Sequence, residues 1–258
     1  MLQGLADVET RLGEALRYTD ALADTAARHL LEAGGKRVRP LLTLLAARAA
    51  GAAEITGDVL DAAVVTELTH LATLYHDDVM DEAATRRGTD AAHRIWGNSV
   101  AILTGDLIFS RASLIISELG ARPLAIQAKT FERLVLGQLH ETSGPAADED
   151  RLAHYIKVIE GKTGSLIAAA CEYGSTLAGA PEQTVQVLVR YGELVGVAFQ
   201  LADDVIDVTA DAETSGKTPG TDLRRGRGDP AEHPGAPGRC GRGRGGRPRG
   251  GADRWGPH

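Results

Sequence analysis

The spacing of apolar residues is the feature that most constrains the fold. Apolar residues recur three and four positions apart, as on one face of a helix, from residue 2 to about residue 31. Similar runs cover residues 58–81, 99–119, 123–141, 148–158, 162–174 and 181–207. Pro40 begins a further apolar run at the position that proline favours in a first helical turn. No segment shows the strict alternation of a half-buried strand, so the sequence predicts an all-α fold.

Composition agrees with this prediction and narrows the function. Aromatic residues make up 4% of the 258 residues, which suits helices better than sheets. The length is sufficient for one large domain with its own core. The formal net charge is −7, and an acidic surface of this kind is a poor general surface for nucleic acid but suits an enzyme that collects divalent cations. We therefore expect no nucleic-acid partner.

The cysteines and the N-terminal segment bear on location. Cys171 and Cys240 lie far apart without metal-ligand spacing, so they predict no disulfide framework. The first residues lack the basic segment and apolar run of a signal peptide, and no stretch approaches the ~18 consecutive apolar residues of a membrane span. These features predict a cytoplasmic protein with no integral membrane segment.

The C-terminal segment differs from the rest of the chain. Residues 226–258 contain 16 glycines and prolines among 33 residues, and they include no Leu, Ile, Val, Met, Phe or Tyr. Such a segment cannot bury enough apolar surface to offset its ordering entropy. We therefore predict a helical domain over residues 1–225 and a disordered Arg/Gly/Pro-rich tail over residues 226–258.

Two Asp-Asp-x-x-Asp clusters carry the strongest chemical signal. The first comprises Asp77, Asp78 and Asp81, and the second comprises Asp203, Asp204 and Asp207. On a helix the first and last aspartates of each cluster lie one turn apart on one face, so their carboxylates can converge on a cation that also binds phosphates. Oxygen ligands of this kind suit magnesium. Two such faces opposite each other would clamp a diphosphate through bridging metal ions.

A single cluster of this kind is equally typical of a solvated helix end. Here, however, residues 71–75 and 195–199, directly before the two clusters, are apolar or aromatic with few polar positions. Carboxylates beside a core are costly unless cations accompany them. The presence of both clusters therefore favours metal binding.

Basic residues occur where a diphosphate would need them. Three of the five lysines lie in Gly-flanked segments, in a chain that otherwise uses arginine: Lys36, Lys162 and Lys217. Arg37 and Arg39 accompany the first of these lysines, whereas Arg86 and Arg87 follow the first acidic cluster. A compact ammonium that reaches a phosphate is a reason to keep lysine there, although each residue alone is compatible with ordinary surface charge.

Taken in order, the segments GGKRVRP, HDDVMD with RRG, GKTG, FQLADDVID and GKTPGTDLR resemble those of the trans-polyprenyl diphosphate synthases over about residues 30–225. The resemblance implies an isoprenoid-synthase bundle of helices around a deep central cavity, with the two aspartate-rich motifs facing each other at its mouth. It also implies a homodimer that uses two or three Mg²⁺ ions per site.

The resemblance assigns roles by position. The implied isopentenyl diphosphate site comprises Lys36, Arg39, His70 and Arg87. The implied allylic diphosphate site comprises Arg86, Lys162, Thr163, Gln200 and Lys217. The implied metal ligands are Asp77, Asp81 and Asp203, and the remaining aspartates of the clusters, Asp78, Asp204 and Asp207, are further candidates. The candidate catalytic residues are Asp77, Asp81, Lys162 and Asp203.

Two histidines and two small residues on the same segment need separate interpretation. His70 alone would be typical of a satisfied core histidine, but its place before the acidic cluster favours a role in the site, whereas His76 is expected to pack or to support a ligand. Ala72 and Thr73 precede Asp77 by five and four positions, and we expect them to point into the cavity that receives the growing chain. A small side chain there predicts a long product. The alternative is that Ala72 packs against a neighbouring helix.

The activity implied is the condensation of isopentenyl diphosphate with an allylic diphosphate to give a linear trans-polyprenyl diphosphate. Metal ions and cationic side chains stabilise the leaving diphosphate, and no side-chain nucleophile is needed. The alternatives are an inactive remnant, a non-catalytic subunit of a heteromeric synthase, and a terpene cyclase. The last is disfavoured because GGKRVRP and Arg87 resemble a site for a second diphosphate.

The sequence departs from the family's pattern after Arg224. The family continues with Glu-Gly-x-Pro and several more helices, and the codons possible for residues 227–235 permit a similar continuation when they are read one nucleotide later. We therefore expect the tail to be out of frame and C-terminal helices to be missing. The alternative is a genuine Arg/Gly-rich tail that binds nucleic acid or an acidic surface, although it lacks the interleaved aromatic residues of a base-stacking segment.

Overall fold

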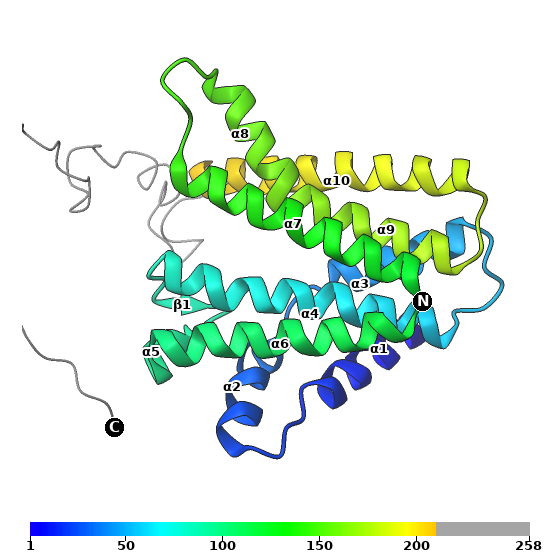
Figure 1. Ribbon diagram of the computed structural model, residues 1–258, viewed down its shortest axis with the longest axis horizontal. Coiled ribbons are helices and arrows are strands. Elements are labelled where there is room, and N and C mark those ends of the chain that lie inside the picture. Colours follow the sequence, from blue (N-terminus) through cyan, green and yellow to red (C-terminus); the bar gives the residue numbers. More distant parts are fainter. Residues whose placement is uncertain (210–258) are drawn as a thin grey trace, which may run out of the picture.

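The computed structural model describes residues 1–209, with side chains through residue 206. Helices dominate these residues, which confirms the predicted all-α fold (Figure 1). The helices are α1 (Leu2–Ala15), α2 (Ala21–Glu32), α3 (Val38–Ala49), α4 (Gly57–Met80), α5 (Ala92–Trp96), α6 (Asn98–Glu118), α7 (Ala121–Ser143), α8 (Arg151–Ile159), α9 (Ser165–Leu177) and α10 (Glu182–Thr209). The predicted tail lies outside the described residues.

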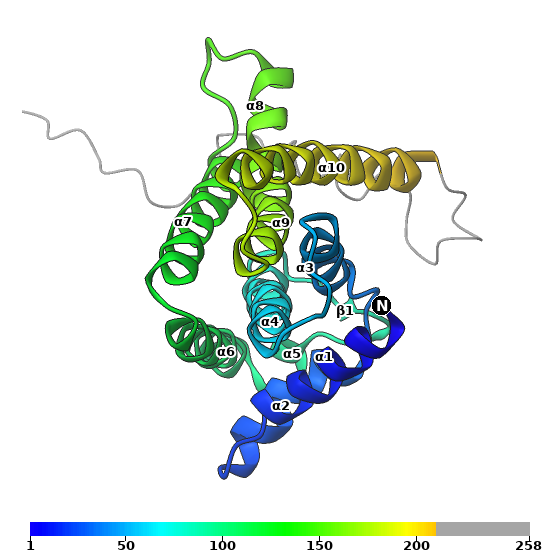
Figure 2. The same ribbon diagram turned by 90° about the vertical axis from the view of Figure 1, so that its right-hand side faces the viewer.

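Helix α4 occupies the centre of the bundle, with α1, α3, α6 and α9 around it and α10 on the outside (Figure 2). It begins after Thr56, whose side chain accepts a hydrogen bond from the backbone amide of Val59, an arrangement that satisfies a free donor of the first turn. Leu68 and Leu71 on α4 have no exposed surface. The first acidic cluster therefore lies at the end of a central and largely buried helix.

A buried tyrosine of α4 attaches α2 to the central helix. The hydroxyl of Tyr75 on α4 donates a hydrogen bond to the carbonyl of Ala26 and accepts one from the amide of Leu30 at 3.3 Å. Both contacts lie in the core, where an unpaired hydroxyl would be costly. Helix α2 is thereby held beside the C-terminal half of α4.

Four short elements were not predicted from the sequence. Strands β1 (Thr85–Arg86) and β2 (Thr89–Asp90) form an antiparallel hairpin directly after α4, and α5 follows it. A single π-helical turn, η1 (Glu160–Gly164), joins α8 to α9. These elements are too short to show a periodic pattern, which explains why the sequence did not reveal them.

The π-helical turn packs against α7 backbone to backbone. A Cβ atom placed on Gly137 of α7 would lie 2.6 Å from the amide nitrogen of Lys162, and one on Gly161 would lie 2.9 Å from the Cα of Gly137. Such distances leave no room for a side chain at either position. The two glycines therefore allow η1 to approach α7 closely enough to direct Lys162 toward the end of α4.

Helices α6 and α10 are long and apolar enough, by length and composition, to cross a membrane. Core helices of bundles meet the same criteria, and α6 packs along the length of α4 (Figure 1). The predicted absence of a membrane-spanning segment therefore stays a prediction.

Candidate active site

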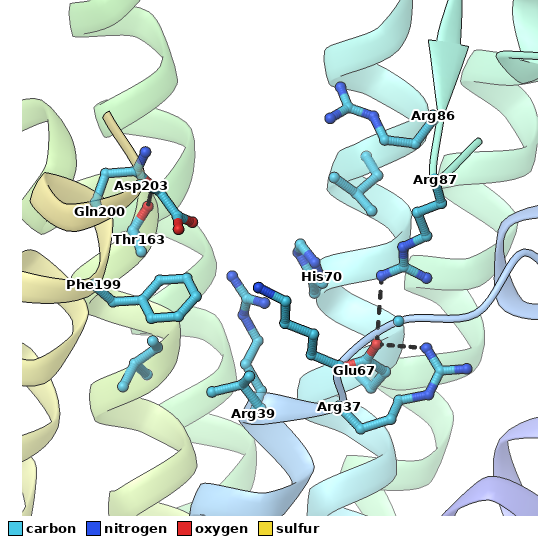
Figure 3. Close-up of a pocket in the computed structure, with 15 residues that line it drawn as sticks. Arg37, Arg39, Glu67, His70, Arg86, Arg87, Thr163, Phe199, Gln200 and Asp203 are labelled. Carbon is cyan, nitrogen blue, oxygen red and sulfur yellow. Dashed lines mark hydrogen bonds and ion pairs between the residues drawn. The ribbon is translucent and has the colours of Figure 1, made fainter. Parts of the chain in front are cut away.

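A cavity of about 570 Å³ opens between the loop before α3, helix α4, the β1–β2 hairpin and helix α10 (Figure 3). Its basic side carries Lys36, Arg37, Arg39, His70, Arg86 and Arg87. Its other side carries Thr163, Phe199, Gln200 and Asp203. All four residues implied for isopentenyl diphosphate thus line the same cavity as three of those implied for the allylic diphosphate.

Burial lowers the pKa of two residues on the basic side of the cavity, Arg39 and His70. The Nε atom of Arg39 is buried and has no hydrogen-bond partner among the described residues. Burial lowers the pKa of Arg39 to about 10, which still leaves the side chain charged at neutral pH. Burial, together with the charges of Arg39 and Arg87, lowers the pKa of His70 well below its usual value. The cavity therefore presents fixed positive charges beside a neutral imidazole.

The first acidic cluster is linked to η1 by an ion pair. The Nζ of Lys162 lies 3.9 Å from Oδ2 of Asp77 and 2.6 Å from Oε2 of Glu141 on α7. Burial raises the pKa of Asp77 to about 6, although the ammonium of Lys162 opposes this shift. Burial also disfavours the charged form of Lys162, but Asp77 and Glu141 outweigh it and raise the pKa of the lysine. The end of α4 thus holds a carboxylate that gains from any added cation.

The second and third aspartates of this cluster have different surroundings from Asp77. Asp78 is buried, and its Oδ1 accepts a hydrogen bond from Nε of Arg86 at 2.7 Å. This ion pair fastens the β1–β2 hairpin to the end of α4. Asp81 is the C-terminal cap of α4 and is half-buried. Arg86, implied to bind the allylic diphosphate, is in this structure the partner of Asp78.

The second acidic cluster is ordered by a short chain of hydrogen bonds. The hydroxyl of Tyr155 on α8 donates to Oδ2 of Asp204, and Nε2 of Gln200 donates to Oδ1 of Asp204 at 2.8 Å. Oγ1 of Thr163 donates to Oε1 of Gln200 at 2.8 Å. Asp203 is exposed and faces the cavity. Asp204 is thereby engaged with side chains of α8 and α10.

The sequence model of the polyprenyl synthetase family matches residues 20–228. The chain belongs to this family. It is 47% identical over 223 residues to the nonaprenyl diphosphate synthase of Mycobacterium tuberculosis, covering 86% of this chain and 66% of that protein. This family member therefore spans about two thirds of the length of that relative.

Solved structures of family members show the same fold. The polyprenyl synthase of Caulobacter crescentus, complexed with calcium and isoprenyl diphosphate, has a TM-score of 0.80 and 38% identity over 86% of this chain and 67% of that one. The geranylgeranyl pyrophosphate synthase of Corynebacterium glutamicum, in complex with the same two ligands, has a TM-score of 0.75 and 46% identity over the same shares. The predicted isoprenoid-synthase bundle is therefore confirmed for this member of the polyprenyl synthetase family.

Several of the predicted site residues of this family member are not gathered in the cavity. Asp77 and Asp81 lie at the end of α4 and Lys162 lies on η1, and none of the three is in the cavity lining. Lys217 and the side chain of Asp207 lie outside the described residues. Their implied roles stay predictions, as do the roles of the residues that the cavity does gather.

The donor set fits magnesium only with help from a ligand. Within residues 1–206 no three His, Cys, Asp or Glu side chains gather closely enough to hold a metal ion on their own. Magnesium is commonly bound through one or two carboxylates together with substrate phosphates. The buried carboxylate of Asp77, beside Asp81, provides hard oxygen ligands of this kind. The residues therefore fit Mg²⁺ that is shared with a bound diphosphate.

The residues expected to set product length occupy a different environment from the one inferred. Ala72 has no exposed surface and does not line the cavity, and its carbonyl faces Gly105 on α6. Thr73 is half-buried and donates a hydrogen bond to the carbonyl of His70. This placement supports the alternative in which Ala72 packs against a neighbouring helix. His76 also contacts α6, because its Nε2 lies 3.1 Å from the carbonyl of Ile102, in keeping with the predicted packing role.

Sequence reasoning missed three residues that organise this site. Glu67, Glu141 and Tyr155 contact predicted site residues without being part of a recognised motif. A signal existed for Glu67, which is an acid within the apolar stripe of residues 58–81. For Glu141 and Tyr155 the sequence offers no local signal, because their partners lie 21 and 49 positions away.

Proposed function

We propose that this chain is a prenyltransferase that condenses isopentenyl diphosphate with an allylic diphosphate to form a linear polyprenyl diphosphate. One observation carries the proposal: a single cavity joins five cationic side chains and a neutral histidine on one side to Thr163, Gln200 and Asp203 on the other. The two substrates each carry a diphosphate, which fixed positive charge would bind. The nearby carboxylates would hold the metal that stabilises the leaving diphosphate. The family membership and the ligands of the solved relatives support it.

In this proposal the basic side of the cavity holds isopentenyl diphosphate. Lys36, Arg39 and Arg87 would bind its phosphate oxygens through charge-assisted hydrogen bonds. The unpaired, buried Nε of Arg39 supports an anionic ligand there, because a bound phosphate would supply the missing acceptor. His70, neutral through its lowered pKa, can donate a hydrogen bond without adding charge.

The allylic diphosphate would lie nearer α10 and η1. In this proposal Lys162, Thr163 and Gln200 would contact its phosphates, and Asp77, Asp81 and Asp203 would hold Mg²⁺. When bound, the metal would neutralise the charge that develops on the leaving diphosphate. The allylic carbon–oxygen bond would break, and the new carbon–carbon bond would form. One proton would then be lost to the released diphosphate.

We also propose that the working form is a homodimer in a reducing cytoplasm. Adjacent helices α6 and α7 expose large apolar side chains, including Leu103, Leu114, Leu136 and Leu139. A second copy that covers this surface would remove it from water. The buried Cys171, which has no disulfide partner among the described residues, fits a reducing compartment.

The test is a turnover assay with the full chain, Mg²⁺, radiolabelled isopentenyl diphosphate and a short allylic diphosphate, followed by chromatography of the dephosphorylated products. We expect radiolabel in linear prenyl alcohols, and none when EDTA is present. A terpene cyclase would instead convert the allylic diphosphate alone to a hydrocarbon. Absence of any product with a folded chain would favour an inactive remnant or a non-catalytic subunit, and recovery of activity on adding a second polypeptide would distinguish these two.

A further inference from the structure

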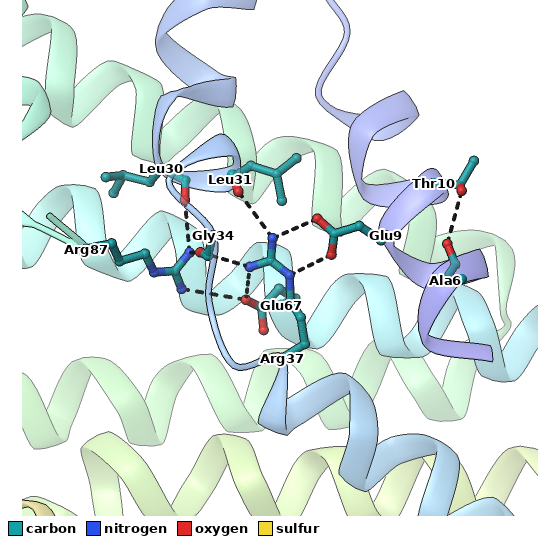
Figure 4. Close-up of polar contacts among 9 residues, drawn as sticks. All are labelled: Ala6, Glu9, Thr10, Leu30, Leu31, Gly34, Arg37, Glu67 and Arg87. Carbon is teal, nitrogen blue, oxygen red and sulfur yellow. Dashed lines mark hydrogen bonds and ion pairs between the residues drawn. The ribbon is translucent and has the colours of Figure 1, made fainter. Parts of the chain in front are cut away.

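A buried carboxylate on α4 joins two loops of the cavity (Figure 4). Glu67 is 1% exposed, and its Oε1 lies 3.0 Å from NH1 of Arg37 and 3.7 Å from NH2 of Arg87. Arg37 belongs to the loop before α3, whereas Arg87 belongs to the turn between β1 and β2. A charge this deeply buried needs such partners, so Glu67 ties both loops to the central helix.

Arg37 lines the cavity, but its guanidinium donates its hydrogen bonds to other groups of the protein. Its Nε and NH2 form a fork with the two carboxylate oxygens of Glu9 on α1, at 2.8 and 2.9 Å. It also donates to the carbonyls of Leu31 and Gly34, each at 3.2 Å. With Glu67 these partners occupy the donors of the fork, so Arg37 anchors the loop instead of binding a ligand.

Arg87 is held by the same loop from the other side. Its NH1 donates to the carbonyl of Leu30 at 2.9 Å and to that of Gly34. Both arginines therefore contact the carbonyl of Gly34, and both contact the carboxylate of Glu67 (Figure 4). The position of Arg87 thus depends on Glu67 and on the loop that carries Lys36.

The charges around Glu67 explain why a carboxylate is needed here. Arg37, Arg39 and Arg87 gather around one small volume, and like charges at this separation repel each other. The carboxylate opposes this repulsion and fixes the spacing between the guanidinium groups. Glu67 is an anion beside an anion site, which by itself would weaken binding of a phosphate. It is nearly inaccessible and shared between two arginines, so we expect its effect on their placement to dominate.

We propose that Glu67 is a positioning residue for diphosphate binding, and that the Glu9–Arg37 fork extends this support to α1. The inference rests on the proposed function for the identity of the ligand, namely the diphosphate of isopentenyl diphosphate. The affinity of this site then depends on a carboxylate that does not touch the ligand. The first helix of the chain, α1, also contributes to that affinity.

Calorimetric titration of the full-length chain with inorganic pyrophosphate and with isopentenyl diphosphate tests the inference without turnover. We expect Glu67→Ala to weaken binding of both by about tenfold, the size of one lost charge-assisted contact. Glu67→Gln, which keeps the shape and one acceptor, should weaken it less, and Glu9→Gln less again. Asp61→Asn is the matched control, because Arg11 and Asp61 also pair α1 with α4 but lie outside the cavity lining.

The readouts separate positioning from simple stabilisation. A purely structural role would lower the melting temperature of the Glu67 variants and leave the dissociation constants of the folded protein unchanged, which would overturn the inference. Tighter binding by Glu67→Ala would also overturn it, because charge competition would then dominate. If Glu67→Ala does not fold, the comparison of Glu67→Gln and Glu9→Gln with Asp61→Asn decides the question.

Failure of the proposed function can be distinguished from failure of the positioning role of Glu67. In an active chain, the Glu67 variants should raise the Michaelis constant for isopentenyl diphosphate, with kcat and the Michaelis constant for the allylic diphosphate little changed. A wild-type chain that binds pyrophosphate but forms no product would contradict the proposed function and leave the positioning role standing. A wild-type chain that binds neither ligand would overturn both.

Discussion

The two acidic clusters share one sequence spacing but have different surroundings. The first ends α4, the helix at the centre of the bundle, and its Asp78 is buried against Arg86. The second lies near the end of α10, an outer helix whose Leu194 is 53% exposed, and its Asp203 is exposed and faces the cavity. The same motif is therefore fixed by packing in one place and by a few polar contacts in the other.

The two clusters therefore differ in how firmly the surrounding structure holds them in position. Around the first cluster, helices on several sides hold the backbone, and burial raises the pKa of Asp77 against the opposing charge of Lys162. Around the second, the order comes from the hydrogen bonds that connect Tyr155, Asp204, Gln200 and Thr163. We infer that the first cluster is organised before a ligand arrives, whereas the second depends on side chains that a ligand can rearrange.

The largest expected effect is on turnover. Asp77→Ala and Asp203→Ala should each reduce kcat by about a hundredfold or more, because each removes a carboxylate from the proposed metal site. Both variants should keep their helical circular dichroism. Steady-state assays at saturating Mg²⁺ provide the measurement, and near-normal kinetics for either variant would show that its cluster does not hold the metal.

The second prediction concerns stability. Leu71→Ala on α4 should lower the free energy of unfolding by about 2–5 kcal/mol, since this side chain has no exposed surface and its loss leaves a cavity. Leu194→Ala on α10 should change the free energy of unfolding by less than about 0.5 kcal/mol. Urea denaturation followed by circular dichroism measures both. Equal losses would mean that α10 is covered as thoroughly as α4.

A smaller effect is expected from Tyr155→Phe, which removes one hydrogen bond to Asp204 and little volume. We expect about a tenfold increase in the Michaelis constant for the allylic diphosphate, because a hydrogen bond to a charged group contributes roughly 1.5–3 kcal/mol. Tyr191→Phe, an exposed tyrosine on α10, is the control. An unchanged Michaelis constant would show that the second cluster is ordered without α8.

The smallest predicted effect is a pH dependence on the basic side of the cavity. The pKa of His70 is lowered by burial and by neighbouring arginines, so the folded state binds fewer protons than the unfolded state. Stability is therefore present above the unfolded pKa of about 6.5 and is lost as the pH falls below it. Wild type should lose about 1 kcal/mol more than His70→Gln between pH 7 and pH 5.5.

Urea titrations of both proteins without ligand at pH 8, 7 and 5.5 measure this difference. The value at pH 8 serves as the reference, since His70 is neutral there in both the folded and the unfolded chain. Parallel pH profiles for the two proteins would contradict the lowered pKa of His70.

The helices were predictable from sequence because their apolar stripes are long and regular. The predicted boundaries of the α4 segment, residues 58–81, differ from the observed helix Gly57–Met80 by one residue at each end. Short elements such as α5 and η1 were missed because five residues cannot establish a period. Their conformations depend on contacts with distant segments, which a local pattern does not record.

The site was partly predictable for a similar reason. Lys36, Arg39, His70 and Arg87 occur in recognisable segments, and the structure brings them to one cavity. Glu67 escaped notice because an acid on a helix usually indicates a solvated face, and its partner Arg37 lies 30 positions away. Supporting residues of this kind are defined by tertiary contacts, whereas ligand-binding segments carry their own local signature.

The close crossing of α7 and η1 has a consequence for how the chain tolerates change. Because Gly137 and Gly161 touch through their backbones, any substitution at either position inserts at least a methyl group between the two segments. That wedge would displace the backbone that carries Lys162, although the lysine itself remains in the sequence. The two glycines therefore contribute to the position of a charged side chain, even though neither glycine has a functional group.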